Sequence, residues 1–414
     1  MNHLTQPTPA FLLGLALLLL GLLPTTGPGY LRATLRSLHS LEANRSDSDR
    51  HATGYYVGLI DGDPAGRDEL TRHLIGKPST FSNFAHIGAS RFLPNDPLQF
   101  ELIPNIHRPV ASTLFTTNSL GQRDRPYHPA KPPNTLRILL LGASIDMGWG
   151  VDTEDTYENM LEDWLNHHAQ LRRLHRRFEI HNLAMAAYSP LHRLHSFLRK
   201  GPSLQPDLVL IALNRLDLRL LQIHLVSLLQ QGIDPGSPAV HSILAHAGLD
   251  PANPNTQQLD KESIKAQLQP LLPQLHDAIL SELADHCRAA GLPLIALAIP
   301  RASENDSPDS RLPDLQRLAS LTHRLHIPFV DLMPALDDED PADVEIAPWD
   351  DHPNTHGHKL IFRLLAQQIV QSPHLYRLLF ATDPIDLNAL RTAATTSPQD
   401  HHHDQPQLPA PPPR

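Results

Sequence analysis

The sequence predicts an α/β protein, a three-layer α/β/α domain built on a five-stranded parallel sheet. Short apolar runs recur from residue 136 onward, and stretches of helical periodicity separate them. Runs that are apolar throughout are typical of strands that helices cover on both faces. Regular alternation of such strands with helices indicates parallel pairing through right-handed crossovers, and it places functional chemistry at the carboxyl ends of the strands.

The five expected strands are LRILLL (136–141), FEIHNL (178–183), DLVLIAL (207–213), PLIALAI (293–299) and PFVDL (328–332). After the first strand, apolar side chains recur at helical spacing, which predicts one buried stripe rather than a cofactor-binding surface. The members of this stripe are Tyr157, Met160, Leu161, Trp164 and Leu165.

Composition divides the chain into four regions. Residues 1–28 hold the apolar run AFLLGLALLLLGLL (10–23), which fits a signal peptide or a membrane anchor better than a buried core helix. Residues 29–133, here called the lead-in region, contain short strand-like pieces, and residues 134–372 form the α/β domain. Residues 373–414 form a C-terminal extension, which we expect to be disordered from about residue 395 because it is rich in Pro, Gln and His.

The N-terminal run predicts an extracytoplasmic protein, anchored to the membrane by this segment or secreted to the periplasm. Lys and Arg total 34 against 44 Asp and Glu, so the net charge of −10 argues against nucleic acid as a partner. The single cysteine, Cys287, excludes an intrachain disulfide and a multi-thiolate metal site. A nucleotide-binding domain is disfavoured too, because the first strand lacks a following Gly-x-Gly-x-x-Gly and no Walker motif is present.

A serine follows the first expected strand in GASIDMG (142–148). At the carboxyl end of a strand, the hydroxyl of Ser144 faces the crevice and its backbone N–H can stabilise an oxyanion. The alternative is steric, since a small residue is also favoured at a tight strand exit.

The segment WDDHPNTHGH (349–358) stands directly before an apolar helix. Its carboxylates and His352 can supply a general base and the group that orients it, which a serine nucleophile requires. A capping or loop role is the alternative for His352. For His358 we expect a place on the helix surface, bonded to nearby backbone.

These blocks resemble the SGNH or GDSL-type hydrolase superfamily over about residues 100–372. The similar stretches are "RILLLGASIDMGWGVDTEDTYENMLEDWL" at the opening, "HPNTHGHKLI" at the close, and "TTNSLGQRDRPY" (116–127), which is similar to a segment of membrane-anchored members. The resemblance implies a flavodoxin-like fold with Ser144 as nucleophile, His352 as general base and Asp350 as the orienting acid. Asp351 is the fallback acid, because the family's more usual position falls on Trp349.

The resemblance also implies an oxyanion hole made of the Ser144 N–H, the Ala187 N–H and the Asn214 side chain. Ala187 stands where glycine is usual. Strict counting puts Leu216 at the family's asparagine, so Asn214 fits only if the loop shifts by two residues. Two further departures are Ala143 in place of aspartate and Asp146 in place of a hydroxyl residue.

The expected activity is hydrolysis of carboxylic esters, as an esterase, lipase-like enzyme or deacetylase, through an acyl-serine intermediate and without metal or cofactor. The substrate is a small-molecule, glycan or lipid ester. Two alternatives remain at this stage: O-acyl transfer to or from a surface glycan, and a catalytically silent glycan-binding member of the same fold.

Overall fold

The computed structural model describes residues 84, 87–110, 113–302, 308–348 and 350–381. The expected signal segment (1–28), most of the lead-in region before residue 87, Trp349 and the tail beyond residue 381 lie outside these ranges. Within the described part of the chain, no helix is both long enough and apolar enough to span a bilayer.

The central sheet confirms the predicted fold class. Its strands are all parallel and stand in the order β6-β5-β7-β8-β9. Renumbered from the first strand, this is the order 2-1-3-4-5 of flavodoxin-like sheets. The bounds differ from the expected ones by a residue or two: β5 (Thr135–Leu141), β6 (Arg177–Asn182), β7 (Leu208–Leu213), β8 (Leu294–Ala298) and β9 (Phe329–Asp331).

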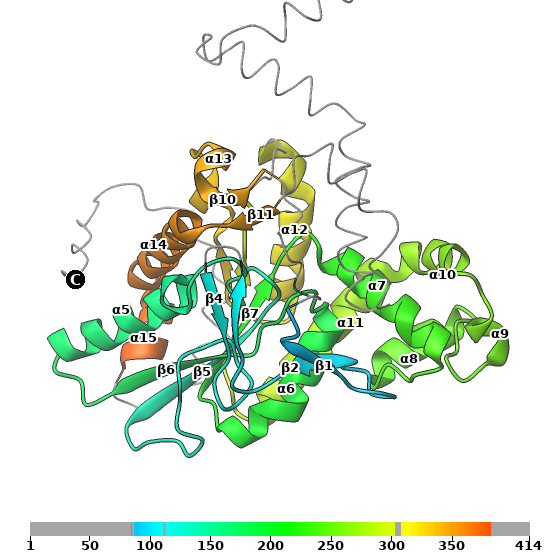
Figure 1. Cartoon of the computed structure of the whole chain (residues 1–414), viewed down its shortest axis with the longest axis horizontal. Helices are drawn as coiled ribbons and strands as arrows, with labels where there is room; N and C mark the ends of the chain where they lie inside the picture. The colour runs from blue at the N-terminus through cyan, green and yellow to red at the C-terminus, as the bar shows by residue number, and fades with distance from the viewer. Residues whose placement is uncertain (1–83, 85–86, 111–112, 303–307, 349, 382–414) are drawn as a thin grey trace, which may run out of the picture. The chain divides into compact units, whose positions relative to one another are not determined.

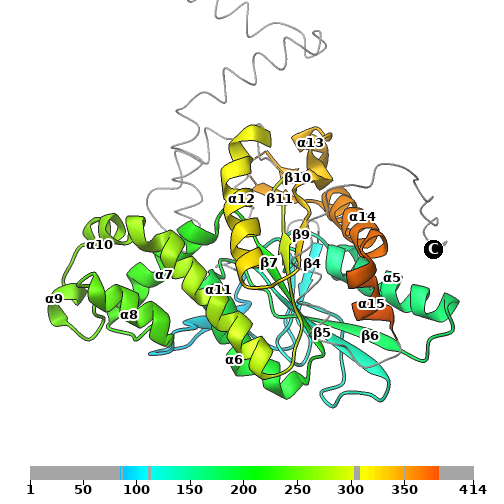
Figure 2. The same cartoon turned by 180° about the vertical axis from the view of Figure 1, so that it is seen from behind.

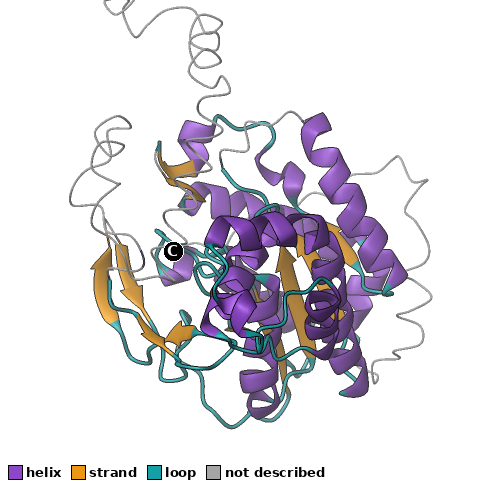
Figure 3. Cartoon of the chain, turned by 90° about the vertical axis from the view of Figure 1, so that its right-hand side faces the viewer, coloured by secondary structure: helices purple, strands orange, loops and turns teal. Residues whose placement is uncertain are grey.

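Helices cover both faces of this sheet, which makes the three layers (Figures 1, 2 and 3). Side chains alternate along β5, so Leu139 and Leu141 pack into one apolar layer and Ile138 and Leu140 into the other. The first layer contains α6 (Pro190–Leu204), α7 (Asp217–Gln231), α8 (Pro238–His246), α10 (Lys261–Leu268), α11 (Leu272–Ala289) and α12 (Pro308–Arg324). The second contains α5 (Tyr157–Leu171), α14 (Thr355–Gln371) and α15 (Pro373–Phe380).

The predicted stripe on α5 faces the core: Tyr157, Leu161 and Leu165 are buried, while Met160 and Trp164 are half-buried. The domain also continues past the expected boundary at residue 372. Ser372 caps α15, and the apolar residues of this short helix pack into the same layer as α5. A helix of eight residues that begins with Pro373 is too short to show a clear period in the sequence.

Short strands also occur in the described part of the lead-in region. They form two antiparallel hairpins, β1 (Ser90–Phe92) with β2 (Phe100–Leu102) and β3 (His107–Val110) with β4 (Thr113–Thr116). The chain after β4 then attaches to the α/β domain: Asp124 Oδ2 accepts from the backbone N of Asn182 at 2.9 Å, and the Tyr127 hydroxyl donates to Glu162 on α5 at 2.5 Å.

A further hairpin, β10 (Glu345–Ala347) with β11 (Asp350–Pro353), precedes α14. Strand β11 carries the Asp350-Asp351-His352 segment.

Candidate active site

Ser144 lies three residues beyond the end of β5, in a tight loop that is largely buried. Within this loop the Met147 N–H donates to the Ala143 carbonyl at 2.9 Å. The carboxylate of Asp146 turns back and accepts from the Ala143 N–H at 2.8 Å and from the Tyr157 hydroxyl at 2.7 Å. Burial raises the pKa of Asp146, against the opposing effect of these hydrogen bonds. Asp146 therefore provides a buried carboxyl group in this loop, whereas Ala143 occupies the position at which the family resemblance implies aspartate.

The loop approaches the β10–β11 hairpin closely at Gly150, which has a φ of +78°. A Cβ built on Gly150 would lie 2.1 Å from Cδ1 of Ile346 on β10. Only glycine meets both conditions without strain. This contact is one of those between the loop of Ser144 and the β10–β11 hairpin, whose second strand carries His352.

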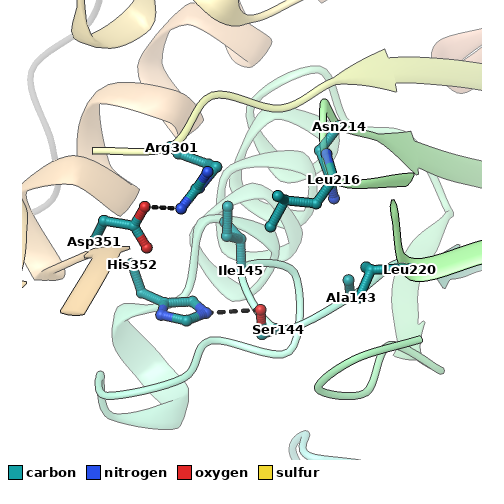
Figure 4. A pocket seen from close by; sticks show the side chains of 9 residues that line it. All are labelled: Ala143, Ser144, Ile145, Asn214, Leu216, Leu220, Arg301, Asp351 and His352. Carbon is teal, nitrogen blue, oxygen red and sulfur yellow. Dashed lines mark hydrogen bonds and ion pairs between the residues drawn. The ribbon is translucent and has the colours of Figure 1, made fainter. Parts of the chain in front are cut away.

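The side chains of Ser144, His352 and Asp350, which the sequence predicted as a catalytic set, lie in contact with one another. The imidazole of His352 stands between the hydroxyl and the carboxylate. The Oγ atom of Ser144 lies 2.7 Å from Nε2 of His352 (Figure 4). On the other side of the imidazole, Nδ1 lies 2.5 Å from Oδ1 of Asp350. This geometry is that of a nucleophile, a general base and an orienting carboxylate.

Asp351, the fallback acid, bonds to a different partner. Its carboxylate forms an ion pair with Arg301, which follows β8, and does not bond to His352 (Figure 4). The backbone of Asp351 also bonds to the segment after β8, since the Ala302 N–H donates to the Asp351 carbonyl at 3.1 Å. Asp350 is therefore the carboxylate in contact with the imidazole.

The two charged groups shift each other's pKa. For His352, burial lowers the pKa, but the charge and hydrogen bond of Asp350, with the charge of Asp351, outweigh it and raise the pKa above its ordinary value. For Asp350, burial raises the pKa, and the His352 charge together with hydrogen bonds from His352 and Trp149 lowers it overall. The site thus favours an imidazolium beside a carboxylate, which is the state reached when the serine proton is taken.

Asn214 stands just past β7 and lines the same pocket as Ser144 (Figure 4). Its Oδ1 accepts from the Leu216 N–H at 2.9 Å, and its Nδ2 donates to no hydrogen bond within the described residues. Leu216 lines the pocket as well. The structure therefore brings both candidate positions to the site, one as an amide donor and the other as an apolar wall.

Ala187 is placed differently. It is buried and is not among the side chains that line the pocket. Its φ of 65° lies in the left-handed region, which a residue with a Cβ enters at a cost. The position where the family resemblance implies glycine thus has a backbone conformation that favours glycine.

The pocket encloses about 320 Å³, its open mouth included. One wall is apolar and the other carries the Arg301–Asp351 pair (Figure 4). The lining consists of Ala143, Ser144, Ile145, Asn214, Leu216, Leu220, Arg301, Asp351 and His352.

Asp350, Asp351 and His352 also offer donor atoms within 4.8 Å of one another, a spacing that a metal ion could bridge. Both carboxylates are already bonded, one to His352 and Trp149 and the other to Arg301. The arrangement is accounted for by these partners.

The prediction for His358 is wrong in one respect. His358 is fully buried, not on the helix surface, and its Nδ1 accepts from the backbone N–H of Tyr157 at 3.1 Å. Burial lowers the pKa of His358 to about 3. The neutral form is the one required here, because Nδ1 can accept the Tyr157 N–H only when it carries no proton. This hydrogen bond joins the start of α5 to the start of α14.

Sequence reasoning missed Trp149 and Arg301. The Trp149 indole donates to Asp350 Oδ2 at 2.9 Å, and Arg301 lines the pocket. Trp149 stood within the Met-Gly-Trp-Gly stretch after the serine, but nothing local indicated its partner. Arg301 stood just after the fourth expected strand, at the edge of the sheet where chemistry collects.

Fold and geometry together define a three-layer α/β/α protein with a serine–histidine–aspartate constellation at the carboxyl edge of its sheet. No protein-family model and no curated protein matches the sequence.

Solved structures similar to this chain include an acetylxylan esterase from Geobacillus stearothermophilus, 14% identical with a TM-score of 0.36 over 56% of this chain and 94% of that one. A psychrotrophic esterase from Pseudoalteromonas sp. is 14% identical with a TM-score of 0.36, over 57% of this chain and 97% of that one. An α/β hydrolase from the metagenome of Lake Arreo, Spain, is 17% identical with a TM-score of 0.34, over 58% and 96%.

Proposed function

We propose that this protein is a serine-dependent hydrolase of carboxylic esters, of the SGNH or GDSL type, that acts through an acyl-serine intermediate. The observation that carries the proposal is the pair of contacts to His352, at 2.7 Å from Ser144 Oγ and 2.5 Å from Asp350 Oδ1. A serine hydroxyl is a weak nucleophile by itself, and a base within hydrogen-bond distance activates it.

In this proposal Ser144 Oγ attacks the ester carbonyl carbon while His352 Nε2 takes the hydroxyl proton. The carbonyl oxygen becomes an oxyanion, which accepts from the Ser144 N–H and from the Asn214 amide. When the tetrahedral intermediate collapses, the C–O bond to the alcohol breaks and the imidazolium returns its proton to the leaving oxygen. Water then repeats the sequence on the acyl-serine and releases the carboxylic acid.

Two features of the site support an active enzyme over a silent glycan-binding member. Asp146 supplies a buried carboxyl to the serine loop in spite of Ala143, and Asn214 lines the pocket in spite of Leu216. The apolar wall formed by Ile145, Leu216 and Leu220 suits the hydrocarbon part of an acyl group, because burial of apolar surface is favourable.

The test is covalent labelling with a serine-reactive phosphonate, with Ser144→Ala as control. We expect one adduct on the wild type, located at Ser144 by peptide mass spectrometry, and none on Ser144→Ala. In parallel, wild type should hydrolyse p-nitrophenyl acetate far faster than His352→Ala. Absence of labelling, or equal turnover by both proteins, contradicts the proposal.

Hydrolysis and O-acyl transfer share the acyl-serine step, so product analysis separates them. The acylated protein is offered water alone or water with an oligosaccharide. Release of the free acid in both cases supports the hydrolase; recovery of the acyl group on the sugar supports the transferase.

We propose in addition that the protein works outside the cytoplasm. The support is the apolar run at 10–23, which lies outside the described residues. Fusion of an alkaline phosphatase reporter after residue 133 in a bacterial host tests this, since the reporter is active only after export. We expect activity from the full N-terminus and none when residues 1–28 are deleted.

A further inference from the structure

Trp149 touches both halves of the site. It stands in the loop that carries Ser144, and only 2% of it is exposed. Its backbone N–H donates to the Ser144 carbonyl at 3.0 Å. Its indole Nε1–H donates to Asp350 Oδ2 at 2.9 Å, across 201 residues of sequence.

With the indole hydrogen bond, both carboxylate oxygens of Asp350 have a hydrogen-bond partner. The other oxygen, Oδ1, accepts from the backbone N–H of His352 at 3.3 Å and lies 2.5 Å from its Nδ1. Oδ2 would otherwise be a largely buried, charged acceptor without a donor, which is costly. With both oxygens bonded, the carboxylate cannot turn away from the imidazole without breaking a hydrogen bond.

The loop holds the indole in place. The Arg123 guanidinium bonds to carbonyls on both sides of Trp149, to Met147 at 3.1 Å and to Val151. The ring of Phe84 meets the indole edge-on, with centroids 5.9 Å apart. Both Phe84 and Arg123 come from the lead-in region, so this region fixes the loop that carries the nucleophile.

We propose that Trp149 is a positioning residue, which holds the Asp350 carboxylate against His352 and ties that pair to the loop of Ser144. The inference rests on the proposed function of Ser144 and His352. A positioning role makes a prediction that a purely structural role does not. The chemical shift of the Trp149 indole proton must depend on the charge state of the His352–Asp350 pair.

A test that needs no activity uses the indole N–H signals in a two-dimensional ¹⁵N–¹H NMR spectrum. The chain has 3 tryptophans, so few such signals are expected, and Trp149→Phe identifies the one of interest. We expect the Trp149 signal to shift with pH in a single step that follows protonation of His352, and to lose this step in His352→Gln. The Trp164 signal is the internal control, since His352→Gln leaves it unchanged. A Trp149 signal that does not respond to His352→Gln overturns the inference.

The kinetic test compares Trp149→Phe with Trp164→Phe, which makes the same chemical change on α5. Trp164 stacks on His168 and lies outside the site. We expect Trp149→Phe to lower kcat by about tenfold with little change in KM, and to move the acid limb of the pH–rate profile to higher pH. The limb moves this way because a carboxylate that has lost one donor attracts the imidazolium more strongly. Trp164→Phe should match the wild type.

The outcomes separate the two proposals. If wild-type protein neither labels nor hydrolyses esters, the proposed function fails, while the NMR titration still decides whether Trp149 senses His352. If wild-type protein is active and Trp149→Phe retains its kcat and its acid limb, only the role of Trp149 fails. A loss of thermal stability without a shift of the limb also overturns it, because it indicates packing alone.

Discussion

The Nε2 atom of His352 lies 2.7 Å from Oγ of Ser144, although 208 positions separate the two residues. Two neighbouring helices account for this meeting. Helix α5 follows the serine loop, α14 follows the strand of His352, and both pack on the same face of the sheet (Figure 1). The Tyr157 N–H donates to Nδ1 of His358, and this hydrogen bond joins the first turns of the two helices. The N-termini of α5 and α14 therefore lie side by side.

Asp350 and Asp351 should differ sharply in their effect on catalysis. Asp350→Asn removes the charge beside His352 Nδ1 and changes the preferred tautomer, so we expect kcat for p-nitrophenyl acetate to fall by about 10²–10⁴. Asp351→Asn is the matched control, because it alters a neighbouring carboxylate that bonds to Arg301, and its kcat should fall by less than about tenfold. Equal losses in both variants would falsify the assignment of Asp350.

The pH–rate profile should have an acid limb above the ordinary histidine value of about 6.5. His352 acts as a base only when neutral, and its pKa is raised, so activity is full above that raised pKa and is lost as the pH falls through it. In Asp350→Asn the limb should move to lower pH, because burial then acts with less opposition. Measurement of kcat/KM from pH 4.5 to 9 tests this. A wild-type limb at or below the ordinary value of about 6.5 contradicts the prediction.

Asn214→Asp tests the oxyanion donor with the least structural change. An aspartate can still accept from the Leu216 N–H, but it replaces the Nδ2 donor with an acceptor. We expect kcat to fall by about 10²–10³. The free energy of unfolding should fall as well, because the new carboxylate is buried close to Asp217. Steady-state kinetics and urea denaturation are measured on the same preparation. Unchanged kcat removes Asn214 from the oxyanion hole.

Ala187→Gly should stabilise the protein. The φ of 65° costs alanine about 1–2 kcal/mol, which glycine avoids. Glycine also makes the unfolded chain more flexible, which offsets part of this gain, so the net stabilisation is about 0.5–1 kcal/mol. Ala186→Gly is the control, since Ala186 is buried next to it without a positive φ and should be destabilised. Urea midpoints decide; a lower midpoint for Ala187→Gly than for wild type contradicts the strain argument.

A buried histidine pair should make stability fall in mild acid. His192 and His224 stack with ring centroids 3.4 Å apart, and Ser189 Oγ lies 2.9 Å from Nδ1 of each. Burial lowers the pKa of His224 to about 3, and burial with the nearby His224 lowers that of His192 well below its ordinary value. The unfolded chain therefore binds more protons below pH ~6.5, and each histidine removes about 1.4 kcal/mol per pH unit there.

His224→Gln isolates this contribution. Glutamine can keep a donor for the Pro97 carbonyl, which His224 Nε2 approaches at 2.8 Å, but it does not titrate. Between pH 6 and 5 the free energy of unfolding of His224→Gln should fall less steeply than that of wild type. The two slopes should differ by about 1.4 kcal/mol per pH unit. Urea denaturation at a series of pH values measures both slopes. Parallel slopes show that His224 is not kept neutral by the fold.

Local pattern located the elements well because strand and helix periods are properties of neighbouring residues. All five sheet strands lie where apolar runs predicted them, and the stripe on α5 faces the core. Helix α15 was not predicted, because its few apolar residues follow a proline and show no clear period. They are buried only because they pack into the same layer as α5 and α14. His358 was misplaced for a related reason: a histidine carries no sign of whether its helix face is covered.

By itself, the sequence determined the sheet and the two blocks that hold Ser144 and His352, because a strand exit and a helix start leave local signatures. Only the tertiary structure decided which carboxylate bonds to the imidazole, since Asp350 and Asp351 are neighbours and differ in what lies opposite each: Trp149 in one case, Arg301 in the other. Those partners come from distant parts of the chain. Hydrogen bonds of this kind depend on how helices and loops pack, and no pattern within a short window of residues records them.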